Sequence, residues 1–187
     1  MGYDGQFQAI PKSAARDELV RAGSKSLVDS AALIESEGIP VSIVSTGGTG
    51  TYDVSGEYPG ITEIQAGSYL LMDTMYLDRG APFHSSLTVL TTVISTRGGS
   101  HAVVDCGVKA ISGERGLPTV KDLPGVQLKA LHAEHGLLEV DRDSTGALEV
   151  GQKMELCVRY SDATVNLHTS LYGVRHGQIE EVFRIEH

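Results

Sequence analysis

Apolar residues in the first part of the chain recur at helical spacing. Those between residues 13 and 37 are Leu19, Val20, Leu27, Val28, Ala31, Leu33 and Ile34. Ser13 can cap the N-terminus of a helix, and Gly38 and Pro40 can end it. We therefore predict one long helix over residues 13–37.

Short β-branched runs and a glycine-rich loop follow this helix. Residues 41–45 and 61–66 read as strands, and residues 46–51 form a loop between them. Residues 67–77 carry Leu70, Leu71, Met72 and Met75, which favours a second helix. The order helix, strand, loop, strand, helix is typical of an α/β fold.

The pattern changes at about Ser85, after which apolar and polar residues alternate in short runs. The predicted strands are 87–95, 101–105, 126–131, 136–141, 153–160, 171–175 and 178–185. The turn signals include Arg97–Ser100 and His176–Gly177. No helical periodicity of useful length follows residue 80, so this half is predicted to be an antiparallel β domain.

Charge and cysteine content narrow the class of protein. The 187 residues contain 24 acids and 15 bases, for a formal charge of −9. This balance argues against nucleic acid or an anionic membrane as partner, since both bind surfaces with clustered lysine and arginine. Cys106 and Cys157 are far apart, so neither a disulfide framework nor a cysteine zinc site is expected. The absence of a spanning apolar run or a secretory leader favours a cytoplasmic protein.

The glycine-rich loop is the strongest local signal for a binding site. Gly47, Gly48 and Gly50 directly follow a predicted strand, so several backbone N–H groups can point at one anion. The hydroxyl groups of Thr46, Thr49 and Thr51 can add donors. A phosphate is the expected ligand, and a flexible connection is the alternative. The loop lacks a P-loop lysine and the dinucleotide-binding spacing, so neither ATP nor NAD is expected.

Other polar residues allow chemistry but have simpler interpretations. His132 and His135, on either side of Glu134, are candidates for acid–base or ligand roles, and structural histidines are the alternative. Lys109 lies in an apolar strand setting, where a covalent role competes with pairing to an acid.

A second polar segment surrounds Asp162, which we predict to lie in a loop over residues 161–164. Asp162 is either an oxygen ligand for a divalent metal or a turn cap. Arg159, Tyr160 and Asn166 flank it and can complete a polar pocket or a hydrogen-bonded corner.

Several motifs together resemble the D-threonine aldolase and D-serine dehydratase family, whose fold is related to that of alanine racemase. The motifs are Ser45–Tyr52, Thr62–Tyr69, Met72–Asp73, Asp105–Ser112, Glu134–Gly136 and Asp162–Leu167. The resemblance follows the family's order over nearly the whole chain. It implies an N-terminal α/β barrel that binds pyridoxal phosphate, followed by a β domain.

The resemblance also assigns roles to residues. Residues 46–51 would bind the coenzyme phosphate, and His135 would take part in proton transfer or orient a metal-bound water. The family's metal site has a histidine followed two residues later by aspartate in the aldolases or cysteine in the dehydratases. The matching positions are Tyr160 and Asp162. Asp162 favours the aldolase branch and would hold a divalent ion such as Mg²⁺, Mn²⁺ or Zn²⁺.

The lysine that holds the coenzyme covalently lies, in the family, before the segment that resembles residues 1–5, so no residue of this chain matches it. We therefore expect an α/β barrel fragment at residues 1–80 and a β domain at residues 81–187. Self-association, or a partner that supplies the missing barrel half, is expected to complete the protein.

The expected activity is lysis of D-β-hydroxy amino acids, by retro-aldol cleavage to glycine and an aldehyde. The alternatives are β-elimination like that of a D-serine dehydratase, and a split or truncated subunit without catalytic activity.

Overall fold

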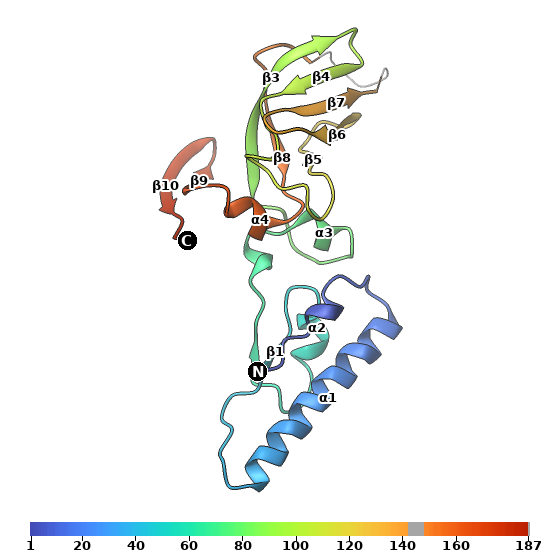
Figure 1. The fold of residues 1–187 in the computed structure, drawn as a ribbon, viewed down its shortest axis with the longest axis vertical. Coiled ribbons are helices and arrows are strands. Elements are labelled where there is room, and N and C mark those ends of the chain that lie inside the picture. Colours follow the sequence, from blue (N-terminus) through green and yellow to red (C-terminus); the bar gives the residue numbers. More distant parts are fainter. Residues whose placement is uncertain (142–147, 187) are drawn as a thin grey trace. The chain divides into compact units, whose positions relative to one another are not determined.

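The computed structural model of the chain describes residues 1–141 and 148–186. The chain divides into two compact units, drawn in sequence colours in Figure 1. Unit 1 comprises residues 1–70 and 75–84, and unit 2 comprises residues 71–74 and 85–187. Residues 71–74 thus belong to unit 2, although the chain on both sides of them belongs to unit 1. None of the described helices is both long enough and apolar enough to cross a membrane.

Unit 1 is built on one long helix, α1 (Ala14–Ser36). The Ser13 side chain accepts a hydrogen bond from the backbone N–H of Arg16 at 3.2 Å, so the cap predicted from the sequence is confirmed. Gly38, with φ of +82°, lies just beyond the helix end, where a left-handed residue allows the chain to turn away.

The strands of unit 1 are much shorter than predicted. β1 (Ser45–Thr46) pairs in parallel with β2 (Glu63–Ile64), and α2 (Tyr52–Ser55) lies between them in sequence. The predictions of strands over residues 41–45 and 61–66 are therefore wrong in length. A residue joins a strand only where it pairs with a neighbouring strand, and the pairing of β1 with β2 is limited to Ser45 with Glu63 and Thr46 with Ile64.

The single helix predicted over residues 67–77 is also wrong. This segment contains a 3₁₀ helix, η2 (Ser68–Leu70), and a short helix, α3 (Thr74–Leu77). Met72 lies between them with φ of +58°, a left-handed conformation that interrupts helical hydrogen bonding. Apolar spacing alone could not reveal this break.

Unit 2 contains a six-stranded antiparallel sheet in the order β5-β8-β3-β4-β7-β6. Its strands are β3 (Thr88–Arg97), β4 (His101–Val104), β5 (Thr119–Val120), β6 (Val126–Leu131), β7 (Gly136–Val140) and β8 (Lys153–Cys157). Residues 88–92 of β3 pair with β8, and Val93 and residues 95–97 pair with β4, with a register shift in this second ladder between Val93 and Ser95. The fully buried apolar core residues of this unit include Val93, Val104, Ile111, Leu138, Leu156 and Val158.

The turns of unit 2 match the sequence prediction closely. Gly98 and Gly99 both have positive φ in the β3–β4 turn, and His176 and Gly177 do so between β9 (Ser170–Arg175) and β10 (Gln178–Arg184). Two successive positive φ values suit the right-handed twist of a hairpin. The prediction of a loop over residues 161–164 is wrong, because α4 (Ser161–Val165) begins there.

Candidate functional site

The glycine-rich loop of unit 1 begins at Thr46, the last residue of β1, and is closed by its own backbone. The N–H of Thr51 donates to the carbonyl of Gly48 at 3.0 Å, and the N–H of Gly48 donates to the Thr51 hydroxyl at 3.1 Å. Gly47 has φ of +76°, a conformation that glycine adopts without strain. The loop is therefore a tight turn rather than an open connection.

Gln8 fixes this loop from the N-terminal segment of the chain. Its side-chain amide donates to Asp4 at 2.6 Å and to the Thr51 hydroxyl at 2.8 Å, and its side-chain oxygen accepts from the N–H of Gly50 at 2.8 Å. A Cβ atom on Gly48 would lie 2.6 Å from that oxygen, and one on Gly50 would overlap the Gln8 carbonyl. Close approach of Gln8 is thus a sufficient reason for glycine at both positions.

Arg16 holds the same loop from the first turn of α1. It is 2% exposed, and its guanidinium donates to the carbonyl of Gly50 at 2.5 Å and to Asp17 at 2.6 Å. A second carboxylate, that of Asp53, lies 3.4 Å from the Arg16 guanidinium and also pairs with Lys12 at 2.7 Å. Burial alone would raise the pKa of Asp53, but hydrogen bonds and charges from Lys12 and Arg16 outweigh it and keep that pKa below its ordinary value.

Sequence reasoning missed both Gln8 and Arg16. Nothing in the local pattern distinguishes Arg16 from an exposed arginine on a surface helix, and Gln8 lies outside every predicted element. Only the approach of residues distant in sequence gives these two side chains a role.

The threonine hydroxyls of the loop, expected to donate to a phosphate, already form hydrogen bonds within the chain. The Thr46 hydroxyl donates to the carbonyl of Gly2 at 2.6 Å, and the Thr49 hydroxyl accepts from the N–H of Tyr69 at 3.0 Å. Within the described residues, the backbone N–H groups of Gly47 and Thr49 make no hydrogen bond. These two N–H groups are therefore unpaired donors among the described residues, and phosphate binding by residues 46–51 stays a prediction.

In unit 2, segment 105–112 brings several sequence motifs together. The N–H of Val108 donates to the carbonyl of His132 at 2.8 Å, and Lys109 forms an ion pair with Glu134. Hydrogen bonding to Glu134 and its charge raise the pKa of Lys109, which is exposed. An exposed, protonated lysine that pairs with an acid fits the simpler interpretation rather than a covalent role.

The other end of this segment contacts α4 and the residues that follow it. The N–H of Ser112 donates to the Thr164 hydroxyl at 3.2 Å, and a ring nitrogen of His168 lies 2.7 Å from the carbonyl of Ala110. Segment 105–112 thus separates two candidate regions. His135 lies exposed in the β6–β7 turn at one end, and Asp162 lies in α4 at the other.

Tyr160 and Asp162 stand at the start of α4, where Tyr160 is the residue preceding the first helical turn. Burial, followed by the nearby Asp162 carboxylate, raises the pKa of the Tyr160 phenol. The Arg115 guanidinium lies 5.1 Å from the centre of the Tyr160 ring, a cation–π arrangement. The Tyr160 ring is therefore held between the Arg115 guanidinium and the nearby Asp162 carboxylate.

Asp73 supports this corner from residues 71–74. Its carboxylate accepts the backbone N–H of Ser161 at 2.7 Å, and the residue is 1% exposed. Burial and the Asp162 charge raise the pKa of Asp73, although the hydrogen bonds from Ser161 oppose them. Asp73 carried no predicted role, although it belongs to a motif by which the family resemblance is recognised.

Among the described residues, no group of three or more histidine, cysteine, aspartate or glutamate side chains could hold a metal ion. Asp162 and Tyr160 remain adjacent polar groups, and their assignment to a metal stays a prediction. The assignment of His135 to proton transfer likewise stays a prediction.

Comparison with known proteins identifies relatives over nearly the whole chain. Residues 86–174 match the family described as "Putative serine dehydratase domain". The chain is 32% identical over 187 residues to D-threonine aldolase of Arthrobacter sp. and 33% identical over 193 residues to 3-hydroxy-D-aspartate aldolase of Paracoccus denitrificans (strain Pd 1222). Each match covers 98% of this chain but 49% of the relative.

Solved structures agree with these relatives. The fold superposes on the crystal structure of D-threonine aldolase from Filomicrobium marinum with a TM-score of 0.91 and 30% identity, over 98% of this chain and 50% of that chain. D-threo-3-hydroxyaspartate dehydratase from Delftia sp. HT23 shares the fold, with a TM-score of 0.83 and 23% identity over 99% of this chain and 55% of that chain.

The chain is thus related to the D-threonine aldolase and D-serine dehydratase family, and it spans about half the length of the curated relatives it matches. The predicted fold class, an α/β barrel fragment followed by an antiparallel β domain, is confirmed. Its curated relatives are lyases, both aldolases and dehydratases.

Proposed function

We propose that this chain is the C-terminal part of a pyridoxal-phosphate-dependent lyase that cleaves D-β-hydroxy amino acids by a retro-aldol reaction. The main support is the match to D-threonine aldolase, which extends over 98% of this chain in both sequence and backbone. The matched motifs lie in both units, so the likeness is not limited to the β domain.

The glycine-rich loop is the part of this chain that would hold the coenzyme. In our proposal the N–H groups of Gly47 and Thr49 bind the phosphate, and Gln8 and Arg16 keep the loop in shape. Pyridoxal phosphate, when bound, supplies the electron sink for cleavage of the substrate's Cα–Cβ bond. The chain's own contribution is to hold and orient the phosphate end.

In our proposal Asp162, in unit 2, acts on the substrate. A divalent cation bound by this carboxylate would be placed to polarise a β-hydroxyl group of the substrate, a Lewis-acid role. Oxygen ligands favour a hard cation such as Mg²⁺ or Mn²⁺. Tyr160 would contribute a hydrogen bond, because a phenol whose pKa is raised is a poor metal ligand.

A dehydratase is the second candidate function. D-threo-3-hydroxyaspartate dehydratase of Delftia sp. (strain HT23) is 28% identical to the chain over 169 residues. Asp162 favours the aldolase instead, because the resemblance places aspartate at this position in the aldolases and cysteine in the dehydratases.

A non-catalytic role is the third candidate. One experiment separates the aldolase, the dehydratase and the non-catalytic role. The 187-residue chain is produced alone, and also together with the half of Arthrobacter D-threonine aldolase that it does not cover. An aldolase yields glycine and acetaldehyde from D-threonine but not from L-threonine. A dehydratase releases ammonia and oxaloacetate from D-threo-3-hydroxyaspartate. If neither product forms although the two halves associate and retain the coenzyme, both enzyme proposals fail.

A Gly48→Val variant tests the role of the loop in the same system. The valine side chain would displace Gln8 and deform the loop, so we expect the visible absorbance of retained pyridoxal phosphate to be lost while the β domain stays folded. Gly67→Ala is the matched control, because a Cβ atom there meets no heavy atom within 4 Å. Unchanged coenzyme retention in Gly48→Val would remove the loop from the site.

A further inference from the structure

The β9–β10 hairpin stands apart from the six-stranded sheet of unit 2. Its two strands pair with each other and form a sheet of their own. The buried residues of the apolar core described for this unit come from positions 93–158, so none of them lies in β9 or β10. Every residue of β10 is exposed. A hairpin of two strands is only marginally stable in water by itself, so this one is expected to need further packing.

One face of the hairpin is apolar. Ile179 lies opposite Val174, and Val182 lies opposite Tyr172. The register shift between Ile179 and Glu181 brings Val182 to the same face as Ile179, so the four apolar side chains form one surface, here called the apolar hairpin face. Each of the four is between 54% and 63% exposed. Apolar residues scattered singly over a surface are common, whereas a contiguous group favours an interaction surface.

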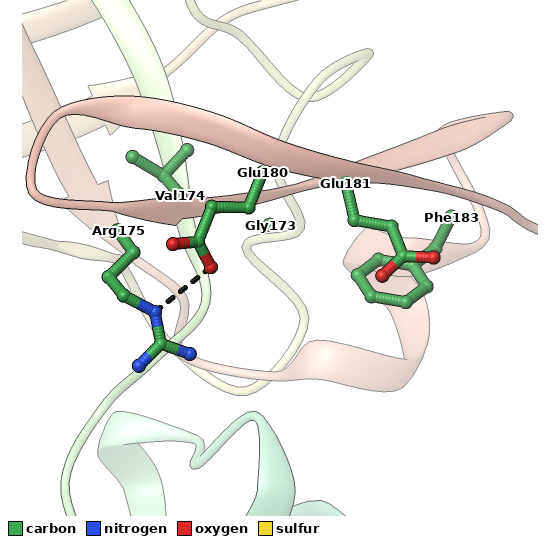
Figure 2. Close-up of a pocket in the computed structure, with 6 residues that line it drawn as sticks. All are labelled: Gly173, Val174, Arg175, Glu180, Glu181 and Phe183. Atoms are coloured by element: carbon green, nitrogen blue, oxygen red, sulfur yellow. Dashed lines mark hydrogen bonds and ion pairs between the residues drawn. The ribbon is translucent and has the colours of Figure 1, made fainter.

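The other side of the hairpin carries charged groups near the turn. Figure 2 shows Arg175, Glu180 and Glu181 on this side together with Phe183, while Val174 points to the opposite side. The Arg175 guanidinium donates to the Glu180 carboxylate at 2.9 Å. Ionised groups favour hydration, so the apolar hairpin face is the side that gains more from being covered.

The relatives indicate what covers this face. D-threonine aldolase from Filomicrobium marinum superposes over 98% of this chain, which includes most of the hairpin, but over only 50% of its own chain. The two aldolases compared above are likewise matched over 49% of their length. The hairpin therefore belongs to a fold with about as much chain again. A second copy of this chain suits the face less, because each copy carries a formal charge of −9 and like charges oppose association.

We propose that the apolar hairpin face is the docking surface for the half of the lyase fold that this chain does not cover. The partner is thus a polypeptide that presents apolar side chains to Tyr172, Val174, Ile179 and Val182. This inference rests on the proposed function, in which the chain is the C-terminal part of a longer enzyme. Covering the face removes apolar surface from water, which stabilises both the hairpin and the complex.

The test uses the 187-residue chain and the half of Arthrobacter D-threonine aldolase that it does not cover, without coenzyme or substrate. The hairpin variant combines Val174→Thr with Val182→Thr, which keeps β-branched side chains of the same shape and replaces a methyl group with a hydroxyl in each. The sheet variant, Leu90→Thr with Ile94→Thr in β3, is the matched control, at positions that are 64% and 42% exposed. Sedimentation equilibrium measures the affinity, and amide hydrogen exchange is followed over residues 170–184.

We expect the hairpin variant to weaken association by about 10-fold or more, because each hydroxyl would be buried against apolar side chains without a partner. The sheet variant should change the affinity by less than about threefold. Exchange over residues 170–184 should slow when the unsubstituted chain associates. The proposal is overturned if the unsubstituted chain does not associate, if its hairpin exchange does not slow, or if the two variants bind equally well.

The chain alone tests the other occupants of the face. If it forms a dimer that the hairpin variant breaks, a second copy covers the face and the proposal fails. If the hairpin variant lowers the melting temperature of the chain alone and the sheet variant does not, the chain itself covers the face and the proposal also fails.

Product assays separate this inference from the proposed function. Two halves that associate through the hairpin but form no product support the docking surface and contradict the lyase. Two halves that form product, with an association that the hairpin variant does not weaken, support the lyase and contradict the docking surface.

Discussion

The two units keep their shape by different means. Unit 2 has a continuous apolar core beneath a six-stranded sheet. In unit 1 the buried side chains are mostly polar. The buried polar residues of unit 1 are Asp4, Gln8, Arg16, Ser24, Ser45, Thr46, Thr49, Thr51 and Ser55. Its buried apolar residues are Val20, Val44, Val54, Met75 and Tyr76.

This difference follows from what each unit contains. A six-stranded sheet buries alternate residues of every strand, so an apolar core forms without further partners. Unit 1 contains a two-stranded parallel sheet, which offers little area to cover. Directional hydrogen bonds around the glycine-rich loop therefore carry much of its organisation. We expect unit 2 to depend on the volume of its core, and unit 1 to depend on a few specific bonds and on pH.

The largest effect is expected in the core of unit 2. Leu156→Ala would remove a fully buried side chain from β8 and leave a cavity, at a cost of about 3 kcal/mol in the free energy of unfolding. The Cys106 thiol reports this loss of stability. Burial, and secondarily the Asp105 charge, raises its pKa to about 11, so it reacts slowly with thiol reagents while the unit is folded. Leu137→Ala, at a 39% exposed position of β7, is the control. Equal labelling of Cys106 in the two variants would contradict the importance of this core.

The next effect is expected at Arg16 in unit 1. Arg16→Ala would remove the donor to the Gly50 carbonyl and the cation between Asp17 and Asp53, at a cost of about 2 kcal/mol. Hydrogen exchange of residues 46–55 should rise while that of β3 and β8 does not. Arg21→Ala, an exposed position on the same helix, is the control. A rise in exchange throughout unit 2 would mean that the two units do not unfold independently.

A smaller effect is expected at Gln8. Gln8→Ala would leave the N–H of Gly50 and the carboxylate of Asp4 without this partner, at a cost of about 1 kcal/mol. Limited proteolysis within residues 46–51 should accelerate, whereas Gln6→Ala, at an exposed neighbouring position, should leave the rate unchanged. Equal cleavage rates in the two variants would show that Gln8 does not fix the loop.

The smallest effect is a pH dependence limited to unit 1. Lys12 and Arg16 keep the pKa of Asp53 below its ordinary value against the opposing effect of burial, so this carboxylate stabilises the folded unit above its unfolded pKa. That contribution is lost as the pH falls through the lower folded pKa. Asp53→Asn should therefore make the exchange rates of unit 1 less sensitive to acid, with Asp29→Asn, in an exposed ion pair with Lys25, as control. Identical acid profiles in the two variants would contradict this.

Local sequence signals predicted much of the fold. The α1 helix, the β3–β4 turn and the β9–β10 turn depend on residues close together in the chain: a serine cap, two adjacent glycines and a His-Gly pair. The predictions failed where the local structure depends on contacts between residues distant in the chain. Examples are the lengths of β1 and β2 and the break in the predicted helix at Met72. The candidate site divides in the same way. The sequence indicated residues 46–51, Tyr160 and Asp162, but it gave no role to Gln8, Arg16 or Asp73.

The sequence by itself determined the two halves of the chain, their order and the motifs that relate them to a family, because periodicity, turn residues and motif spacing are local properties. The tertiary structure alone decided which side chains support those motifs. Gln8 reaches Gly50 and Asp73 reaches Ser161 across 42 and 88 positions of the chain. A hydrogen bond between such distant residues depends on how the whole backbone is folded, and no pattern near either residue records it.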